Sequence, residues 1–152
     1  MKIARTIAIA LTAAGCAPFS EDTMRKDPGL TSSFSTPGLY QDAYFNIKRG
    51  FLACMTGTNA MTPDTTMRIP FPIRPRIDIA AQTATITYLE DGGVVKNIWA
   101  IVDIKATPAG TDVKVFTTSL LTDLAPAVKK WIDGSDDCPK HVPVGYRSPL
   151  TE

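Results

Sequence analysis

The section from residue 77 to residue 117 alternates apolar and polar side chains, and this alternation restricts the fold more than any other feature. A β-strand directs successive side chains to opposite faces, so a period of two predicts half-buried strands. Turn sequences rich in glycine and proline separate the alternating runs, at residues 90–93 and 107–111. Because short turns join antiparallel strands, we expect an antiparallel meander of three to four strands. The apolar positions of the meander are Ile77, Ile79, Ala84, Ile86, Tyr88, Ile98, Ala100, Val102, Ile104, Val113 and Val115.

Two amphipathic helices are predicted to cover the apolar face of this meander. The first is expected over residues 37–55, with Thr36 as the N-cap and Pro37 at the first helical position. The second must begin close before Pro126, since proline is tolerated only in the first turn, and Gly134 is its predicted stop. This order predicts an α+β fold with an N-terminal and a C-terminal helix packed on one face of the sheet. The apolar residues at helical spacing are Tyr40, Tyr44, Ile47 and Phe51 in the first helix, and Leu124, Val128 and Trp131 in the second.

The chain has three cysteines, Cys16, Cys54 and Cys138. Cys54 ends the first predicted helix and Cys138 follows the second, so a disulfide between them would hold the two helices together. A disulfide is typical of a domain in an oxidising compartment. It would close a loop of roughly 85 residues, for which the chain-entropy estimate is about 4.5 kcal/mol. The alternative is a pair of buried thiols.

The first fifteen residues have the features of a secretory signal peptide. Lys2 and Arg5 precede an uncharged, mostly apolar run over residues 6–14. This run is too short to cross a hydrocarbon core of about 30 Å. The residues just before Cys16 are Ala-Ala-Gly, and together with the cysteine they resemble the lipobox of bacterial lipoproteins. The first of these alanines stands where that family usually has leucine.

The resemblance implies that Cys16 carries a lipid and becomes the first residue of the mature protein. In that family, a residue other than aspartate after the cysteine, here Ala17, implies sorting to the outer membrane, and the domain would face the periplasm. The alternative is a secreted protein that is cut near Ala17 and has no lipid. We therefore expect a signal peptide (1–15), a flexible tether (16–36), an α+β domain (37–140) and an irregular tail (141–152), a layout similar to small proteobacterial envelope lipoproteins of unassigned function.

A segment rich in proline and arginine, from residue 61 to residue 76, is the main candidate for a partner surface. Its prolines at positions 63, 70, 72 and 75 predict an extended loop. Arginine and phenylalanine are favoured anchors in protein interfaces. The alternative is that the apolar residues of the segment cover a sheet edge while its arginines face water. The candidate partner residues are Arg68, Phe71, Arg74 and Arg76.

No pattern in the chain predicts catalysis, a cofactor or a metal site. His141 is the only histidine, and Asp136 and Asp137 are adjacent acids of the kind found in solvated turns. The 16 basic and 15 acidic residues nearly cancel, which argues against nucleic acid as a partner.

We therefore expect a lipid-anchored, non-enzymatic protein that binds or supports another envelope component. One alternative is a domain that binds a small ligand or a lipid between its sheet and its helices. A second alternative is a hydrolase that uses Asp136, Asp137 or His141.

The intact mass of the protein from the membrane fraction of its native host tests the anchor and the disulfide together. We expect the mass of a chain that begins at Cys16 with a diacyl-type lipid attached. Reduction should add the mass of the hydrogens that one opened disulfide takes up. A lipid-free chain that begins after Ala17 would contradict the anchor, and a mass unchanged by reduction would contradict the disulfide.

Overall fold

The structure is a computed structural model that describes residues 20–26, 28–56, 58–62, 65–70, 72–91 and 96–140. Within these ranges, it describes only the backbone at residues 58–62 and 65–70 and at residue 96. The predicted signal peptide, Cys16 and the predicted tail with His141 lie outside the described residues.

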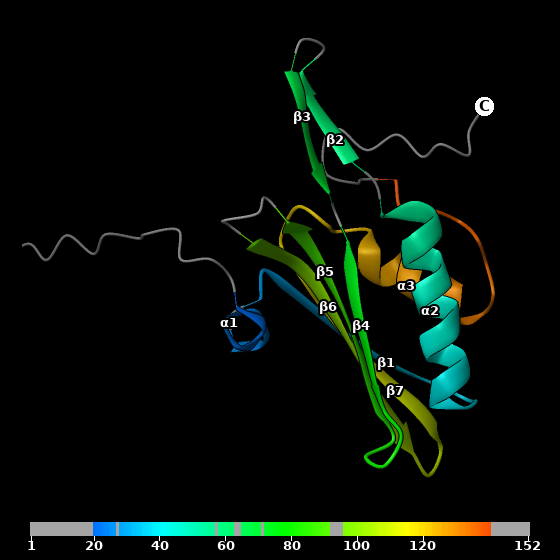
Figure 1. Cartoon of the computed structure of the whole chain (residues 1–152). Coiled ribbons are helices and arrows are strands. Elements are labelled where there is room, and N and C mark those ends of the chain that lie inside the picture. The colour runs from blue at the N-terminus through cyan, green and yellow to red at the C-terminus, as the bar shows by residue number, and fades with distance from the viewer. Residues whose placement is uncertain are drawn as a thin grey trace, which may run out of the picture.

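A five-stranded antiparallel sheet forms the centre of the α+β domain (Figure 1). The predicted meander corresponds to four of its strands, each of which pairs with the next along the chain. The sheet is wider than predicted by one strand, β1, which pairs with β7 in a continuous register from Leu30 opposite Thr117 to Thr36 opposite Thr111. From edge to edge the strands are β1 (Leu30–Thr36), β7 (Gly110–Thr117), β6 (Lys96–Thr107), β5 (Thr83–Asp91) and β4 (Ile73–Asp78).

Three helices pack on this sheet. The helices α2 (Tyr40–Cys54) and α3 (Leu124–Ile132) lie on one side of it in Figure 1, here called the helix face, and α1 (Glu21–Lys26) lies on the other, the α1 face. The main core fills the space between the sheet and the two longer helices. A smaller cluster beneath α1 consists of Met24, Ile101 and Phe116, with Ile98 beside it.

The structure corrects the prediction that residues 16–36 form a flexible tether. Ser20 caps α1, since its hydroxyl accepts a hydrogen bond of 3.1 Å from the backbone N–H of Thr23. Acidic residues in the first turn of α1 and basic residues in the last turn complement the helix dipole. After α1 the chain enters the sheet as β1. Residues 21–26 and 30–36 therefore belong to the folded domain.

Two further predictions are corrected. Thr36 is the last residue of β1 rather than a helix cap, and α2 begins three residues later than predicted, at Tyr40. The segment from 61 to 76 is not a loop, because β2 (Thr58–Thr62) pairs with β3 (Thr65–Pro70) as a hairpin and β4 follows it. Pro75 is tolerated because β4 is an edge strand, where the missing N–H need not interrupt the ladder.

The second helix follows its prediction closely. Pro126 lies in the first turn of α3, where its missing N–H removes no helical hydrogen bond. Beyond the end of the helix, Gly134 adopts a φ of 86°, and its N–H donates to the carbonyl oxygen of Trp131 at 2.9 Å.

The two longer helices meet where the indole ring of Trp131 lies against the backbone of α2 at Gly50. A Cβ atom added to Gly50 would overlap this ring, so only glycine permits the approach. The ring is fully buried and also packs on Phe51, with ring centroids 5.3 Å apart.

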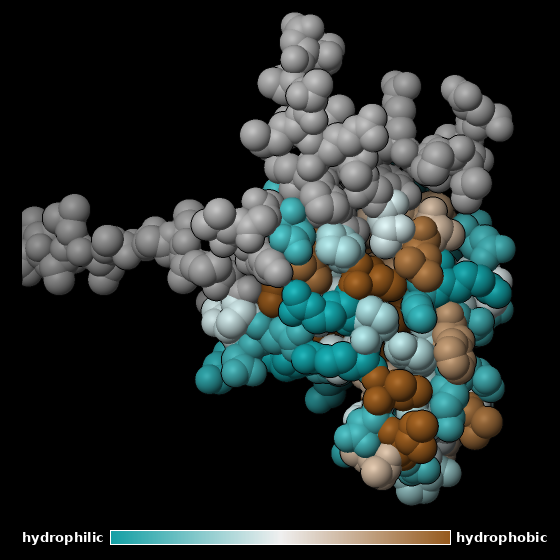
Figure 2. Space-filling model, in the orientation of Figure 1, coloured by the Kyte–Doolittle hydropathy of each residue, from teal (hydrophilic) through white to brown (hydrophobic). Residues whose placement is uncertain are grey.

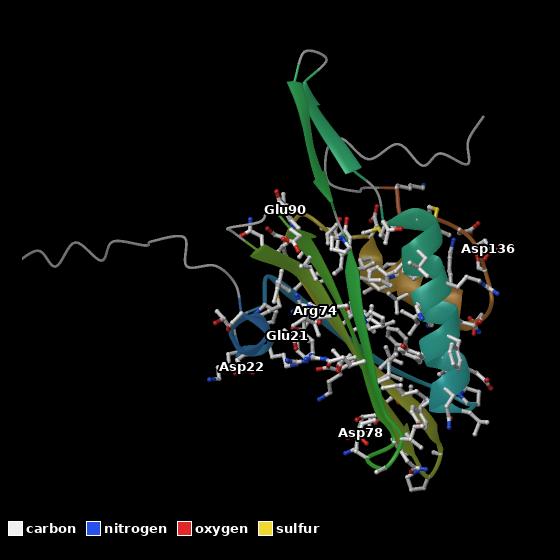
Figure 3. All side chains as sticks on the ribbon, viewed as in Figure 1. Glu21, Asp22, Arg74, Asp78, Glu90 and Asp136 are labelled. Atoms are coloured by element: carbon white, nitrogen blue, oxygen red, sulfur yellow. A yellow bond between two sulfur atoms is a disulfide. The ribbon has the colours of Figure 1, made fainter. Side chains whose placement is uncertain are left out.

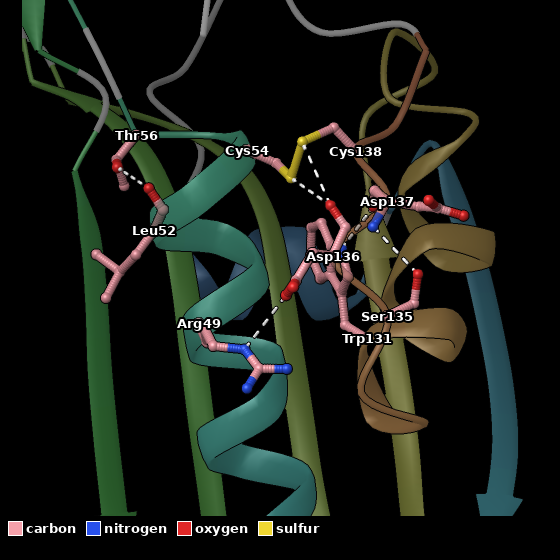
Figure 4. Close-up of a disulfide and its surroundings, with 9 residues drawn as sticks. All are labelled: Arg49, Leu52, Cys54, Thr56, Trp131, Ser135, Asp136, Asp137 and Cys138. Atoms are coloured by element: carbon pink, nitrogen blue, oxygen red, sulfur yellow. Dashed lines mark hydrogen bonds and ion pairs between the residues drawn. A yellow bond between two sulfur atoms is a disulfide. The ribbon is translucent and has the colours of Figure 1, made fainter. Parts of the chain in front are cut away.

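The disulfide between Cys54 and Cys138 links the same two helices covalently (Figure 4). It joins the last residue of α2 to the segment after α3, with the two Cα atoms 5.2 Å apart. The predicted pairing of these cysteines is therefore present in the structure.

Replacing Gly50 by alanine should destabilise the domain by about 2 kcal/mol, because an overpacked core costs about 1–3 kcal/mol. The measurement is urea unfolding of Gly50→Ala against the unsubstituted chain. In a Trp131→Leu background the ring is absent, and Gly50→Ala should then cost little or stabilise α2 by up to about 1 kcal/mol, because alanine favours helix. An equal loss in both backgrounds would contradict the proposed contact.

Candidate binding surface

A network of charged residues and threonines fixes α1 to the sheet (Figure 3). The guanidinium of Arg25 donates two hydrogen bonds to the carboxylate of Asp103 on β6, at 2.8 and 3.0 Å. Thr85 on β5 donates to the same carboxylate at 2.9 Å. Glu21 accepts a hydrogen bond of 2.8 Å from Thr87, which is fully buried. Helix α1 is therefore held on the sheet largely by polar contacts.

The protonation of this network is set by its own partners. Burial opposes ionisation of Glu21, but the hydrogen bond from Thr87, the hydrogen bond and charge of Arg76, and the hydrogen bond from Arg25 outweigh this effect and lower the pKa of Glu21. The hydrogen bonds that Arg25 donates to Asp103 raise the pKa of Arg25. Both groups are charged at neutral pH, so neither is poised to transfer protons there.

The structure places the predicted partner residues in different environments. Arg76 forms an ion pair with Glu21 and so contributes to the α1 network. Arg74 is exposed on the edge strand β4. The backbone of Arg68 lies in the β2–β3 hairpin, but its side chain, like Phe71, is outside the described part of the chain. Ile73 on β4 packs against the core on the helix face. Because side chains alternate along a strand, Arg74 and Arg76 face the α1 side of the sheet.

Large apolar side chains are exposed on the outer side of α2 and along β4. Phe45 and Leu52 on α2 are 58% and 50% exposed, and they are two helical turns apart on one side of the helix. Ile77 at the end of β4 and Ile79 in the turn after it are 39% and 74% exposed. Helix α2 runs alongside β4 and contacts it, and Figure 2 shows hydrophobic side chains on this side of the molecule. We call these four residues the α2–β4 surface.

Of the residues considered for catalysis, Asp136 and Asp137 contact basic side chains, and His141 lies outside the described residues. Asp137 accepts a hydrogen bond of 2.9 Å from Lys130, which lowers the pKa of Asp137. Its carbonyl oxygen accepts a hydrogen bond of 2.8 Å from the indole N–H of Trp131. Asp136 is exposed beside Arg49, with 3.5 Å between the charged atoms (Figure 4). Among the described residues, no group of three or more His, Cys, Asp or Glu side chains could hold a metal ion.

Side chains fill the space between the sheet and the two longer helices. Trp131, Tyr88 and Phe51 are fully buried there, and the Phe51 and Tyr88 rings lie 5.8 Å apart. A depression of about 240 Å³ is found instead on the outer side of α3, where residues 137–140 form its other wall. The space between sheet and helices, which the ligand-binding alternative would use, is thus occupied by the protein's own core.

Comparisons with known proteins found no matching family model, no similar curated protein and no similar solved structure. None of the described helices is long and apolar enough to span a membrane.

Sequence patterns alone did not identify the two exposed apolar residues on the outer side of α2. Phe45 and Leu52 are off the predicted apolar stripe of their helix, and seven residues separate them, a spacing that places both on one side. This spacing was the signal that could have revealed them. The charged network had no comparable local signal, because Arg25 and Asp103 are 78 residues apart.

Replacing Glu21 by glutamine should weaken the attachment of α1 and alter the pH dependence of stability. The pKa of Glu21 in the folded protein is below its ordinary value of 4.5. Its charged form therefore adds stability above that pH, and this stability is lost as the pH falls through the folded pKa. We expect Glu21→Gln to lose about 1 kcal/mol at pH 7, as for a charged hydrogen bond that is partly exposed.

Thermal unfolding between pH 7 and pH 2 checks this expectation. The difference between Glu21→Gln and the unsubstituted chain should shrink toward low pH. Asp22→Asn is the matched control, because Asp22 is an exposed acid on the same helix. A constant difference, or an equal effect of Asp22→Asn, would contradict the role of Glu21.

Proposed function

We propose that the protein is a lipid-anchored, non-enzymatic component of the bacterial envelope that binds another envelope protein through the α2–β4 surface. The anchor is the lipid on Cys16, and the outer membrane is its proposed location, with the domain facing the periplasm. The observation that supports the binding role is the group of exposed apolar side chains on α2, on β4 and in the turn after β4, namely Phe45, Leu52, Ile77 and Ile79.

The apolar residues favour a protein partner on energetic grounds. Single exposed hydrophobic residues are normal, but several on adjacent elements are typical of an interaction site. Covering apolar surface contributes roughly 25 cal/mol per Å². Three of the four side chains lie on α2 or β4 and the fourth lies in the turn after β4. Both elements pack against the core, so binding need not first order a flexible segment.

The charges around this surface indicate the chemistry of the partner. Lys48 lies three residues after Phe45 and four before Leu52, so it projects from the same side of α2. Arg74 is exposed on the other side of β4. Two exposed acids adjoin the same residues, since Asp42 lies three residues before Phe45 and Asp78 lies between Ile77 and Ile79. A partner that combines an apolar patch with charges of both signs at its margin would complement this surface.

No observation in the described part of the chain favours the ligand-binding alternative, since the space it would use is filled by the core. The hydrolase hypothesis likewise gains no support from Asp136 or Asp137, which face solvent and basic side chains.

Site-specific photo-crosslinking in intact cells of the native host tests the proposal. A photo-crosslinking residue at position 79 should capture one recurrent envelope protein, because Ile79 is the most exposed residue of the surface. The same residue at position 129 should not, because Lys129 is exposed on the outer side of α3, away from the α2–β4 surface.

A second substitution makes this capture specific to the surface. Adding Phe45→Asp should reduce the crosslinked product at least tenfold, since it places a charge in the apolar contact. Adding Lys129→Asp is the matched control and should leave the product unchanged. Absence of a recurrent product, or a product insensitive to Phe45→Asp, would contradict the proposal.

A further inference from the structure

The two edges of the sheet differ in how they are protected from pairing with another strand. Edge strand β4 contains Pro75, Arg74, Arg76 and Asp78, and prolines and charges of this kind discourage added strands. Edge strand β1 has the sequence Leu-Thr-Ser-Ser-Phe-Ser-Thr, with no charge and no proline. No described strand pairs with its outer side. A seven-residue neutral edge of this kind is suited to strand addition.

The side chains of β1 permit the strand to pair with a copy of itself. An antiparallel pair about a two-fold axis at Ser33 places Ser33 opposite its own copy and Ser32 opposite Phe34. No like charges meet in this register. Phe34 is half-buried on the helix face, and the two copies of its ring become diagonal neighbours within reach of each other.

The two ends of β1 carry apolar residues that this arrangement brings together. Leu30 begins the strand and is exposed, as is Leu120 in the loop that follows the paired strand β7. Gly29 lies close to this loop, since a Cβ added there would be 2.7 Å from the backbone nitrogen of Ser119. Beyond the other end of β1, Leu39 is also exposed. An antiparallel copy places the leucine end of one chain against the Leu39 end of the other.

We propose that two copies of this chain associate through β1, so that the two five-stranded sheets form one continuous sheet. A second copy is the occupant because the uncharged edge does not repel its own copy and because the two-fold arrangement pairs its apolar residues. The contact is limited to one strand pair and the leucines at its ends. We therefore expect a reversible dimer at the small end of the range of protein interfaces.

Light scattering and sedimentation of the full chain with Cys16→Ser test this dimer, because neither lipid nor thiol at position 16 can then join two copies. The measured mass should rise to twice the monomer mass as the protein approaches millimolar concentration. Ser33→Lys sets two like charges opposite each other and should keep the chain monomeric. Ser33→Thr preserves the uncharged edge and should dimerise like the parent chain.

A cysteine at the two-fold axis provides a second measurement that does not depend on Ser33→Lys folding well. Directly opposite residues of antiparallel strands have Cα atoms about 4.5–5.5 Å apart, a distance that suits a disulfide. In the Cys16→Ser chain, Ser33→Cys should therefore form a covalent dimer on mild oxidation, and Lys129→Cys should not. A monomer at every concentration would overturn the proposal. It would also be overturned if the dimer survived Ser33→Lys, or if cysteine at position 33 failed to crosslink.

Discussion

The contact of Trp131 with the backbone of α2 at Gly50 fixes how the two longer helices lie on the sheet. The buried ring requires glycine at that position, and its N–H donates to the carbonyl oxygen of Asp137. This hydrogen bond directs the chain after α3 toward Cys138, whose disulfide returns to Cys54 at the end of α2. The ring contact, the hydrogen bond and the disulfide together connect α2 to α3 and to the segment after it. The orientation of α2, and with it the exposure of its outer side, depends on these three connections.

The opposite face of the sheet is covered in a different way. A six-residue helix is too short to be stable alone, so α1 depends on its contacts with the sheet. Met24 supplies the apolar contact, and Glu21 and Arg25 bind threonines and charged residues on β4, β5 and β6. These polar contacts join the N-terminal segment to the domain and leave the α2–β4 surface uncovered by α1.

The sequence predicted those parts of the fold that a local period encodes. Alternation in residues 84–88 and 113–117, helical spacing from Tyr40 to Phe51, and the cysteines at two helix ends are each visible without long-range information. β1 was missed because its serines and threonines resemble a linker and it becomes a strand through pairing with β7. A register shift between β5 and β6 places Trp99 against the main core and Ile98 under α1, the reverse of the simple alternation. Such a bulge depends on the partner strand, so one strand's sequence does not reveal it.

The α2–β4 surface is proposed to contact a partner in the envelope, and side-chain footprinting tests this contact most directly. Hydroxyl-radical oxidation can be measured residue by residue on the purified protein and on the same protein in intact envelopes. The proposal predicts that Phe45, Leu52 and Ile79 are oxidised several-fold less in the envelope, while Pro126 on the outer side of α3 reacts equally in both. Equal oxidation of all four residues in the two samples would contradict it.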